Sequence, residues 1–112
     1  MRDKVIKICL ALDWQGERDT WESPDGKEIP FIRFSKFIMP ENDDMNSYHV
    51  AITIWSKNIS IEIIQSCSEH DSEQWATTKI HRIAKVPHAE FIERSNELIQ
   101  QANRNLFEKF NP

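Results

Sequence analysis

The stretch SCSEHDSEQW, residues 66–75, gathers side chains that could bind a metal ion. It holds one thiol, one imidazole and three carboxylates, at Cys67, His70, Glu69, Asp71 and Glu73. Zinc tolerates the spacing of the thiol and the imidazole, but a structural zinc site needs a second Cys or His pair. The only other thiol of the sequence is Cys9. We therefore interpret residues 66–75 as an acidic loop between two strands, and we expect no metal site.

Nucleophilic catalysis needs a Cys or Ser that is held by a histidine, which a third group orients in turn. Ser68, His70 and Asp71 are too close in sequence to reach that geometry among themselves. We therefore expect no catalytic residue here and treat the protein as a non-enzyme.

Two further histidines, His49 and His81, fall in expected strands. On one face of a sheet they would form an acid–base pair. A pocket containing either of them with a carboxylate such as Glu62 would indicate a catalytic or small-ligand-binding domain. This alternative stays open at the level of the sequence.

Glycine is scarce, with only Gly16 and Gly26 in the chain. Phosphate-binding loops need clustered glycines so that backbone N–H groups can approach the anion. We therefore expect no nucleotide cofactor, and no other cofactor is indicated.

Length and composition indicate one domain spanning residues 1–112. Hydrophobic residues make up 39% of the chain and charged residues 29%, which suits one core and not two. The two cysteines do not make a disulfide framework, and the N-terminal apolar run is too short for a signal peptide, so we expect a cytoplasmic protein. No apolar run approaches the roughly 18 residues of a membrane span. The net charge of -4 disfavours nucleic acid as a partner.

The elements that position these residues are mostly expected strands. Residues 4–12 alternate like a strand but also carry a helical stripe, and their β-branched content favours the strand. Residues 13–28 contain an SPDG turn signal and read as a long loop or the end of a loose hairpin. Residues 29–39 are a predicted strand that is apolar on both faces. Residues 75–86 are also predicted as a strand, although Ile80, Ile83 and Ala84 could equally begin a helix.

Residues 48–66 predict a β-hairpin. With a two-residue turn at residues 57–58, Ile54 lies opposite Ile61 and Ile52 opposite Ile63 on one face. The reverse face of this hairpin would be mostly polar.

The chain from Pro87 onward predicts one long helix, because apolar residues recur there at three- and four-residue steps. The expected fold class is α+β: an antiparallel sheet of four to five strands (meander) backed by one long C-terminal helix.

Charge is unevenly distributed along the chain. Of 18 acidic residues, 12 fall in three expected connections, at residues 13–28, 41–44 and 69–73. In a meander the second and third connections lie at the same end of the sheet. We therefore expect an acidic rim for partner binding, formed by Glu41, Asp43, Asp44, Glu69, Asp71 and Glu73.

Four tryptophans lie near these segments or on the reverse face of the hairpin. Tryptophan is enriched at the centre of protein–protein interfaces. We therefore expect partner binding also by Trp14, Trp21, Trp55 and Trp75.

These observations indicate a small acidic protein-binding module. The most specific hypothesis is an inhibitor of a basic partner protein, of the immunity, antitoxin or counter-defence type, that docks by shape and charge. One alternative is a small-ligand-binding or catalytic domain with a cleft between sheet and helix. The other is a structural homodimer that covers an apolar back face formed by Phe31, Phe37, Met39, Trp55 and Ile64. A helical N-terminal segment could supply that cover instead.

Overall fold

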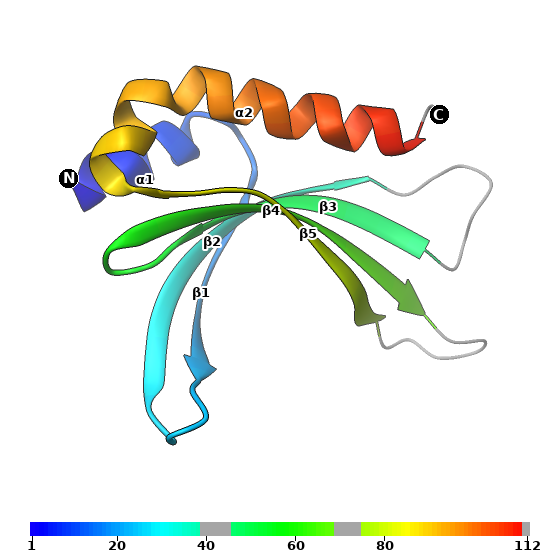
Figure 1. Ribbon diagram of the computed structural model, residues 1–112, viewed down its shortest axis with the longest axis horizontal. Coiled ribbons are helices and arrows are strands. Elements are labelled where there is room, and N and C mark those ends of the chain that lie inside the picture. The colour runs from blue at the N-terminus through cyan, green and yellow to red at the C-terminus, as the bar shows by residue number, and fades with distance from the viewer. Residues whose placement is uncertain (39–45, 69–74, 111–112) are drawn as a thin grey trace.

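The computed structural model describes the backbone of residues 1–38, 46–68 and 75–110, and the side chains of residues 1–36, 48–66 and 80–105. Within these ranges the chain forms a five-stranded antiparallel meander with strands in sequence order and a helix at each end of the chain. Both helices lie on the same side of the sheet (Figure 1). The α+β fold predicted from the sequence is confirmed. In chain order the elements are α1 (Arg2–Leu10), β1 (Gln15–Glu22), β2 (Glu28–Ile38), β3 (Asn46–Ile54), β4 (Asn58–Ser68), β5 (Trp75–Pro87) and α2 (His88–Phe110).

The N-terminal segment is a helix, so the strand predicted for residues 4–12 is wrong. Val5 and Cys9, four positions apart, are both completely buried, and this spacing places them on one side of a helix. They pack into the core beside α2. Tertiary burial of this stripe therefore outweighed the β preference of the isoleucines.

Residues 13–28 form a regular hairpin arm where a loop or loose end was expected. β1 pairs with β2 along its whole length, from Gln15 opposite Ser35 to Glu22 opposite Glu28. The SPDG segment makes the predicted turn: the Gly26 N–H donates to the Ser23 carbonyl, and Gly26 has a φ of 84°. All residues of β1 are exposed, which explains why hydrophobic patterning did not reveal the strand.

The hairpin of β3 and β4 forms with a register two residues away from the predicted one. The Trp55 N–H donates to the Asn58 carbonyl at 2.9 Å, so the two turn residues are 56–57, one position earlier than expected. Ile54 therefore lies opposite Ile59, and Ile52 opposite Ile61. Because the shift is an even number of residues, every side chain keeps its expected face.

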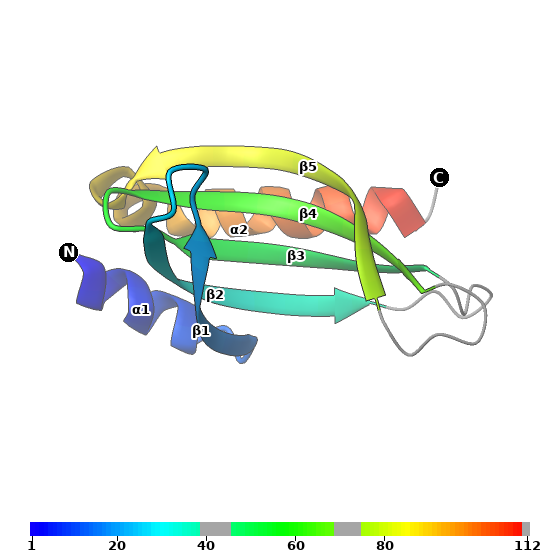
Figure 2. The ribbon, with the colours of Figure 1, turned by 90° about the horizontal axis from the view of Figure 1, so that it is seen from below.

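The core lies between the sheet and the two helices. α2 packs across β3, β4 and β5 and contacts α1 at its N-terminal half (Figures 1 and 2). The amphipathic stripe of α2 supplies this contact, as predicted. The main buried apolar side chains are Val5, Cys9, Ile32, Phe34, Val50, Ile52, Ile54, Ile59, Ile61, Ile63, Phe91, Leu98 and Ala102.

The first residue of α2 ties this helix to the β3–β4 turn. The His88 Nε2–H donates to the Trp55 carbonyl at 2.8 Å, and His88 is buried.

Further along α2, the backbone of Arg94 is non-helical, and its guanidinium binds Glu90 at 3.0 Å and Glu97 at 3.1 Å on either side of the break. The Glu97 pKa is lowered by this hydrogen bond. Among the described residues, neither helix is long and apolar enough to cross a membrane.

Candidate functional site

The sheet has a second face, turned away from both helices, which we call the open face. Both edges of the sheet bend away from the helices, so the β1–β2 hairpin and the first part of β5 extend on this side (Figure 1). Strand pairing defines which residues share the open face. Thr53 lies between Arg33 and Ser60, and Ser60 is paired with Lys85, so one row runs across four strands.

A groove of about 680 Å³ lies along the open face. It begins at the β1–β2 hairpin, passes the β3–β4 turn and ends on β5. The residues that line it are aromatic, aliphatic, basic and hydroxylic, with one carboxylate. They are Thr20, Trp21, Ile29, Phe31, Arg33, Trp55, Ser56, Lys57, Asn58, Ser60, Glu62, Ile80, Arg82 and Lys85.

The aromatic end of the groove is built on Phe31. The Trp55 ring lies 5.0 Å from the Phe31 ring between centroids, in a tilted arrangement. The Arg33 guanidinium lies 4.8 Å from the centroid of the same ring, a favourable cation–π contact. Phe31 is consequently only 7% exposed. The apolar back face expected from the sequence is therefore largely covered by its own neighbours at this point.

Arg33 is held in place by a second contact. Its Nε–H donates to Thr53 Oγ1 at 3.0 Å, and Thr53 is fully buried. A guanidinium has five N–H donors in a rigid fork, so its two terminal nitrogens are left to meet a ligand. Among the described residues no carboxylate forms an ion pair with them, although Glu17 lies opposite Arg33 in the strand register.

Basic residues outnumber acidic ones in the groove, four to one. The single carboxylate, Glu62, lies 3.7 Å from Arg82. In the described part of the chain, Arg33, Lys57 and Lys85 have no such partner. The groove therefore carries an excess of positive charge in a chain whose net charge is -4.

A β-bulge places two of the β5 side chains on the open face. Lys85 pairs with Ser60, but the register shifts after Ile61, so that Arg82 pairs with Glu62 and Ile80 with Ile64. In a regular strand Lys85 and Arg82 would point to opposite faces, because side chains alternate. The extra residue of the bulge reverses that alternation, and both cations reach the groove.

The four predicted tryptophans have different environments. Trp21, 48% exposed, and Trp55, partly buried, both line the groove. Trp14 packs against the edge of the core and does not line the groove. Trp75 begins β5, and its side chain lies outside the described residues.

The six carboxylates of the expected rim, Glu41, Asp43, Asp44, Glu69, Asp71 and Glu73, lie outside the described residues. His70 and the Cys67 side chain also lie outside the described residues. The expectation that this segment binds no zinc therefore stays a prediction. The strands that flank the two segments have their ends together, since Asn46 pairs with Cys67 and Trp75 with Ser68. A common rim therefore stays a prediction.

The two strand histidines do not form a pair. His49 is paired with Ile64, which is paired with Ile80 on the open face. His81 is paired with Ile63, a residue of the core. The bulge explains the difference, because it shifts the alternation of β5. Neither histidine lines the groove, although Glu62 does.

Burial shifts the pKa values of two side chains, His49 and Cys9, and makes them less reactive. Burial, and secondly the charge of Arg33, lower the pKa of His49 to about 4. Burial raises the pKa of the Cys9 thiol to about 12, which keeps it protonated and unreactive. Among the described residues no three His, Cys, Asp or Glu side chains are close enough to hold a metal ion.

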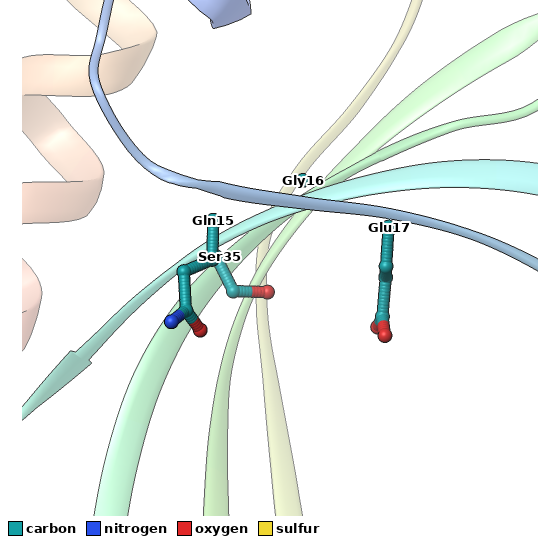
Figure 3. Close-up of a pocket in the computed structure, with 4 residues that line it drawn as sticks. All are labelled: Gln15, Gly16, Glu17 and Ser35. Atoms are coloured by element: carbon teal, nitrogen blue, oxygen red, sulfur yellow. The ribbon is translucent and has the colours of Figure 1, made fainter.

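A second, smaller hollow of about 340 Å³ lies between β1 and β2. Figure 3 shows the Gln15, Glu17 and Ser35 side chains pointing to the same side of these strands, with Gly16 between them. Its lining is polar apart from Gly16 and contains no basic residue. It therefore extends the open face at its β1 edge without repeating the chemistry of the groove.

Comparison with known proteins yields no matching family model, no similar curated protein and no similar solved structure. Function must therefore be argued from the site itself.

The basic part of the groove was not predicted from the sequence. One signal was available: Arg33 follows Phe31 and Glu62 follows Ser60 at strand spacing, on the faces opposite the isoleucines. The bulge that adds Arg82 and Ile80 leaves no comparable mark in the sequence.

Proposed function

We propose that this protein is a protein-binding module that docks its partner in the groove of the open face. The observation that carries the proposal is the exposure of two large apolar side chains, Trp21 (48%) and Ile80 (56%), along the same groove as Arg33 and Arg82. Trp and Arg are the residue types most enriched in interface hot spots. Exposed apolar side chains rimmed by charge are typical of interaction sites.

Two residues of the groove, Trp55 and Arg33, are held in place by contacts with their neighbours. Trp55 contacts Phe31 through its ring, and its carbonyl accepts the hydrogen bond from His88. Arg33 is held by Thr53 and by the Phe31 ring. Rigid side chains lose little entropy on binding, so more of the contact energy is available as affinity. This suits an inhibitor that occupies a partner's surface, the class to which immunity proteins, antitoxins and counter-defence inhibitors belong.

The acidic segments add a separate prediction. Carboxylates at residues 41–44 and 69–73 would attract a basic surface and speed association. A partner with a basic surface near these segments stays a prediction of the charge distribution in the sequence. The proposal of a docking groove does not depend on it.

The test is affinity capture from the native cell with three proteins: the wild type, Trp21→Ala and Ile80→Ala. We expect a stoichiometric partner with the wild type and a loss of roughly tenfold or more with each variant, since truncating a hot-spot residue costs about 2 kcal/mol. Leu10→Ala is the matched control, because Leu10 is 64% exposed and lies on α1, away from the groove. A partner retained equally by all four proteins would show that the groove is not the docking site.

A small-molecule site is the second candidate, because about 680 Å³ lies within the range of ligand pockets, roughly 300–1,000 Å³. The earlier expectation placed such a cleft between sheet and helix, whereas the groove lies on the opposite face. A compound that binds in the groove and leaves partner capture unchanged would favour this candidate.

A further inference from the structure

We propose that the groove of the open face binds an acidic segment of the partner protein. This inference rests on the proposed function and specifies its chemistry. The groove is basic, unlike the acidic segments of the sequence. The partner would therefore present carboxylates and apolar side chains to the groove.

The first argument is the balance of charge in the groove. Four basic side chains and one carboxylate line it, and only Arg82 has an ion-pair partner among the described residues. Arg33, Lys57 and Lys85 form no ion pair inside the described part of the domain, although Glu17 lies opposite Arg33 in the register, and they offer positive charge to a ligand. A partly enclosed surface strengthens such charge relative to open water.

The second argument is the arrangement of these cations. Arg33 on β2 and Lys85 on β5 belong to one row, with Thr53 and Ser60 between them and Glu17 of β1 beyond Arg33. Three strand spacings separate them, about 14 Å. The two residues between them are buried and hydroxylic, so no long side chain rises between the two cations. An extended chain lying across the strands would meet a cation on either side.

The third argument is the readiness of Arg33 for a carboxylate. Its Nε–H is already used by Thr53, and the Phe31 ring supports the guanidinium plane. The terminal nitrogens can then bind both oxygens of one carboxylate, the geometry in which arginine surpasses lysine. Trp21 and Ile80 flank the groove and would take apolar side chains of the same segment.

A nucleic acid fits this groove less well. Single strands bind by stacking bases on free aromatic faces, but the Phe31 ring is covered by Trp55 and by Arg33. Glu62 would lie against the phosphates, and Glu17 is close by in the register. A peptide can place an amide or a lysine at these points, whereas a phosphate backbone cannot.

A second copy of this chain fits less well for a related reason. In a twofold dimer made through the open face, each groove would meet its own counterpart. Two surfaces with the same excess of positive charge would then be buried together, which is costly. The homodimer expected from the apolar back face is also weakened by the low exposure of Phe31 (7%) and Ile64 (5%).

The test is an NMR titration of the isotope-labelled protein with three probes. The first is a blocked peptide in which glutamates flank a Leu-Ser-Leu centre, the second is the same peptide with lysines, and the third is oligothymidylate. We expect the acidic peptide to shift the indole signals of Trp21 and Trp55 and the backbone signals of Arg33 and Lys85. Its affinity should fall several-fold as salt rises from about 50 to about 300 mM. No shift up to millimolar peptide, or tighter binding of the lysine peptide or of oligothymidylate, would overturn the inference.

Charge reversal gives the matched variants. In Arg33→Glu/Lys85→Glu we expect at least a tenfold loss of acidic-peptide affinity, because two charge-assisted contacts are replaced by repulsion, and a gain for the lysine peptide. Lys4→Glu/Lys7→Glu is the control, since it changes the net charge by the same amount at exposed positions of α1, outside the groove. Equal losses in the two proteins would reveal a net-charge effect and defeat the inference.

The same variants separate the two proposals. A captured partner that is lost with Trp21→Ala but retained with the charge-reversed groove would leave the docking site standing and refute its acidic occupant. A partner that is indifferent to both kinds of variant would refute the docking site itself.

Discussion

At the scale of single residues, His49 shows how the fold changes the chemistry of a side chain. The sequence presented it as a candidate acid–base group. In the structure it is partly buried in β3 with Arg33 nearby, and its pKa is lowered from 6.5 to about 4. The imidazole is therefore neutral in the native state at physiological pH.

His49 predicts an acid-sensitive stability. Its native pKa is depressed, so between pH 6.5 and about 4 the unfolded chain binds a proton that the folded chain does not. The free energy of unfolding should consequently be intact above pH 6.5 and decline as the pH falls towards 4. We expect this residue to account for a loss of about 2 kcal/mol, after allowance for its partial contact with solvent.

Urea unfolding at about pH 7 and about pH 4.5 measures the effect. His49→Gln should lose less stability on acidification than the wild type, whereas His81→Gln, at an exposed position, should behave like the wild type. An identical pH dependence in all three proteins would contradict the assignment.

At the scale of elements, the edge strand β1 depends on one glycine. Gly16 is paired with Phe34, whose ring belongs to the core. A Cβ at Gly16 would lie 2.9 Å from Cε1 of that ring, closer than van der Waals contact allows. Because Gly16 has no side chain, β1 leaves the space that the Phe34 ring of β2 occupies.

Gly16→Val should therefore destabilise the domain by about 1–3 kcal/mol, the usual cost of overpacking. Thr20→Val, at an exposed position of the same strand, should stay within about 0.5 kcal/mol of the wild type. Thermal or urea unfolding of the two variants makes the comparison. If both variants are equally stable, the Phe34 ring is not confined by Gly16.

At the scale of the whole molecule, the two faces of the sheet differ: one holds the core and the other holds the groove. The helix-covered face holds the continuous core, with residues such as Ile52, Ile61 and Leu98 almost completely buried. The open face holds the groove and its exposed anchors. Stability and binding should then be separable by mutation, which is the property that a docking module requires.

Leu98→Ala should cost about 2–4 kcal/mol, because it removes a buried side chain of α2 and leaves a cavity. Ile80→Ala, at a position 56% exposed, should change the free energy of unfolding by less than about 0.5 kcal/mol. Urea unfolding curves of both variants would test this. A large loss in Ile80→Ala would show that the open face also contributes to the fold, and the separation would fail.

How well the sequence predicted each element depends on how far apart along the chain the interacting residues lie. The helix from Pro87 and the hairpin of residues 48–66 were predictable because their periodic apolar residues follow one another along the chain. The helical stripe of Val5 and Cys9 was visible but undecided, since only contact with α2 resolves it. β1 was not expected as a full strand because its residues are all exposed and carry no burial pattern.

The sequence by itself determined a single meander with a C-terminal helix, and it determined which isoleucines turn towards the core. Only the tertiary structure decided that Arg33, Lys85 and Arg82 meet in one groove. Local periodicity depends only on residues that are close in sequence. Which side chains of distant strands become neighbours depends on strand register, and a shift of one turn position or one bulge changes that register.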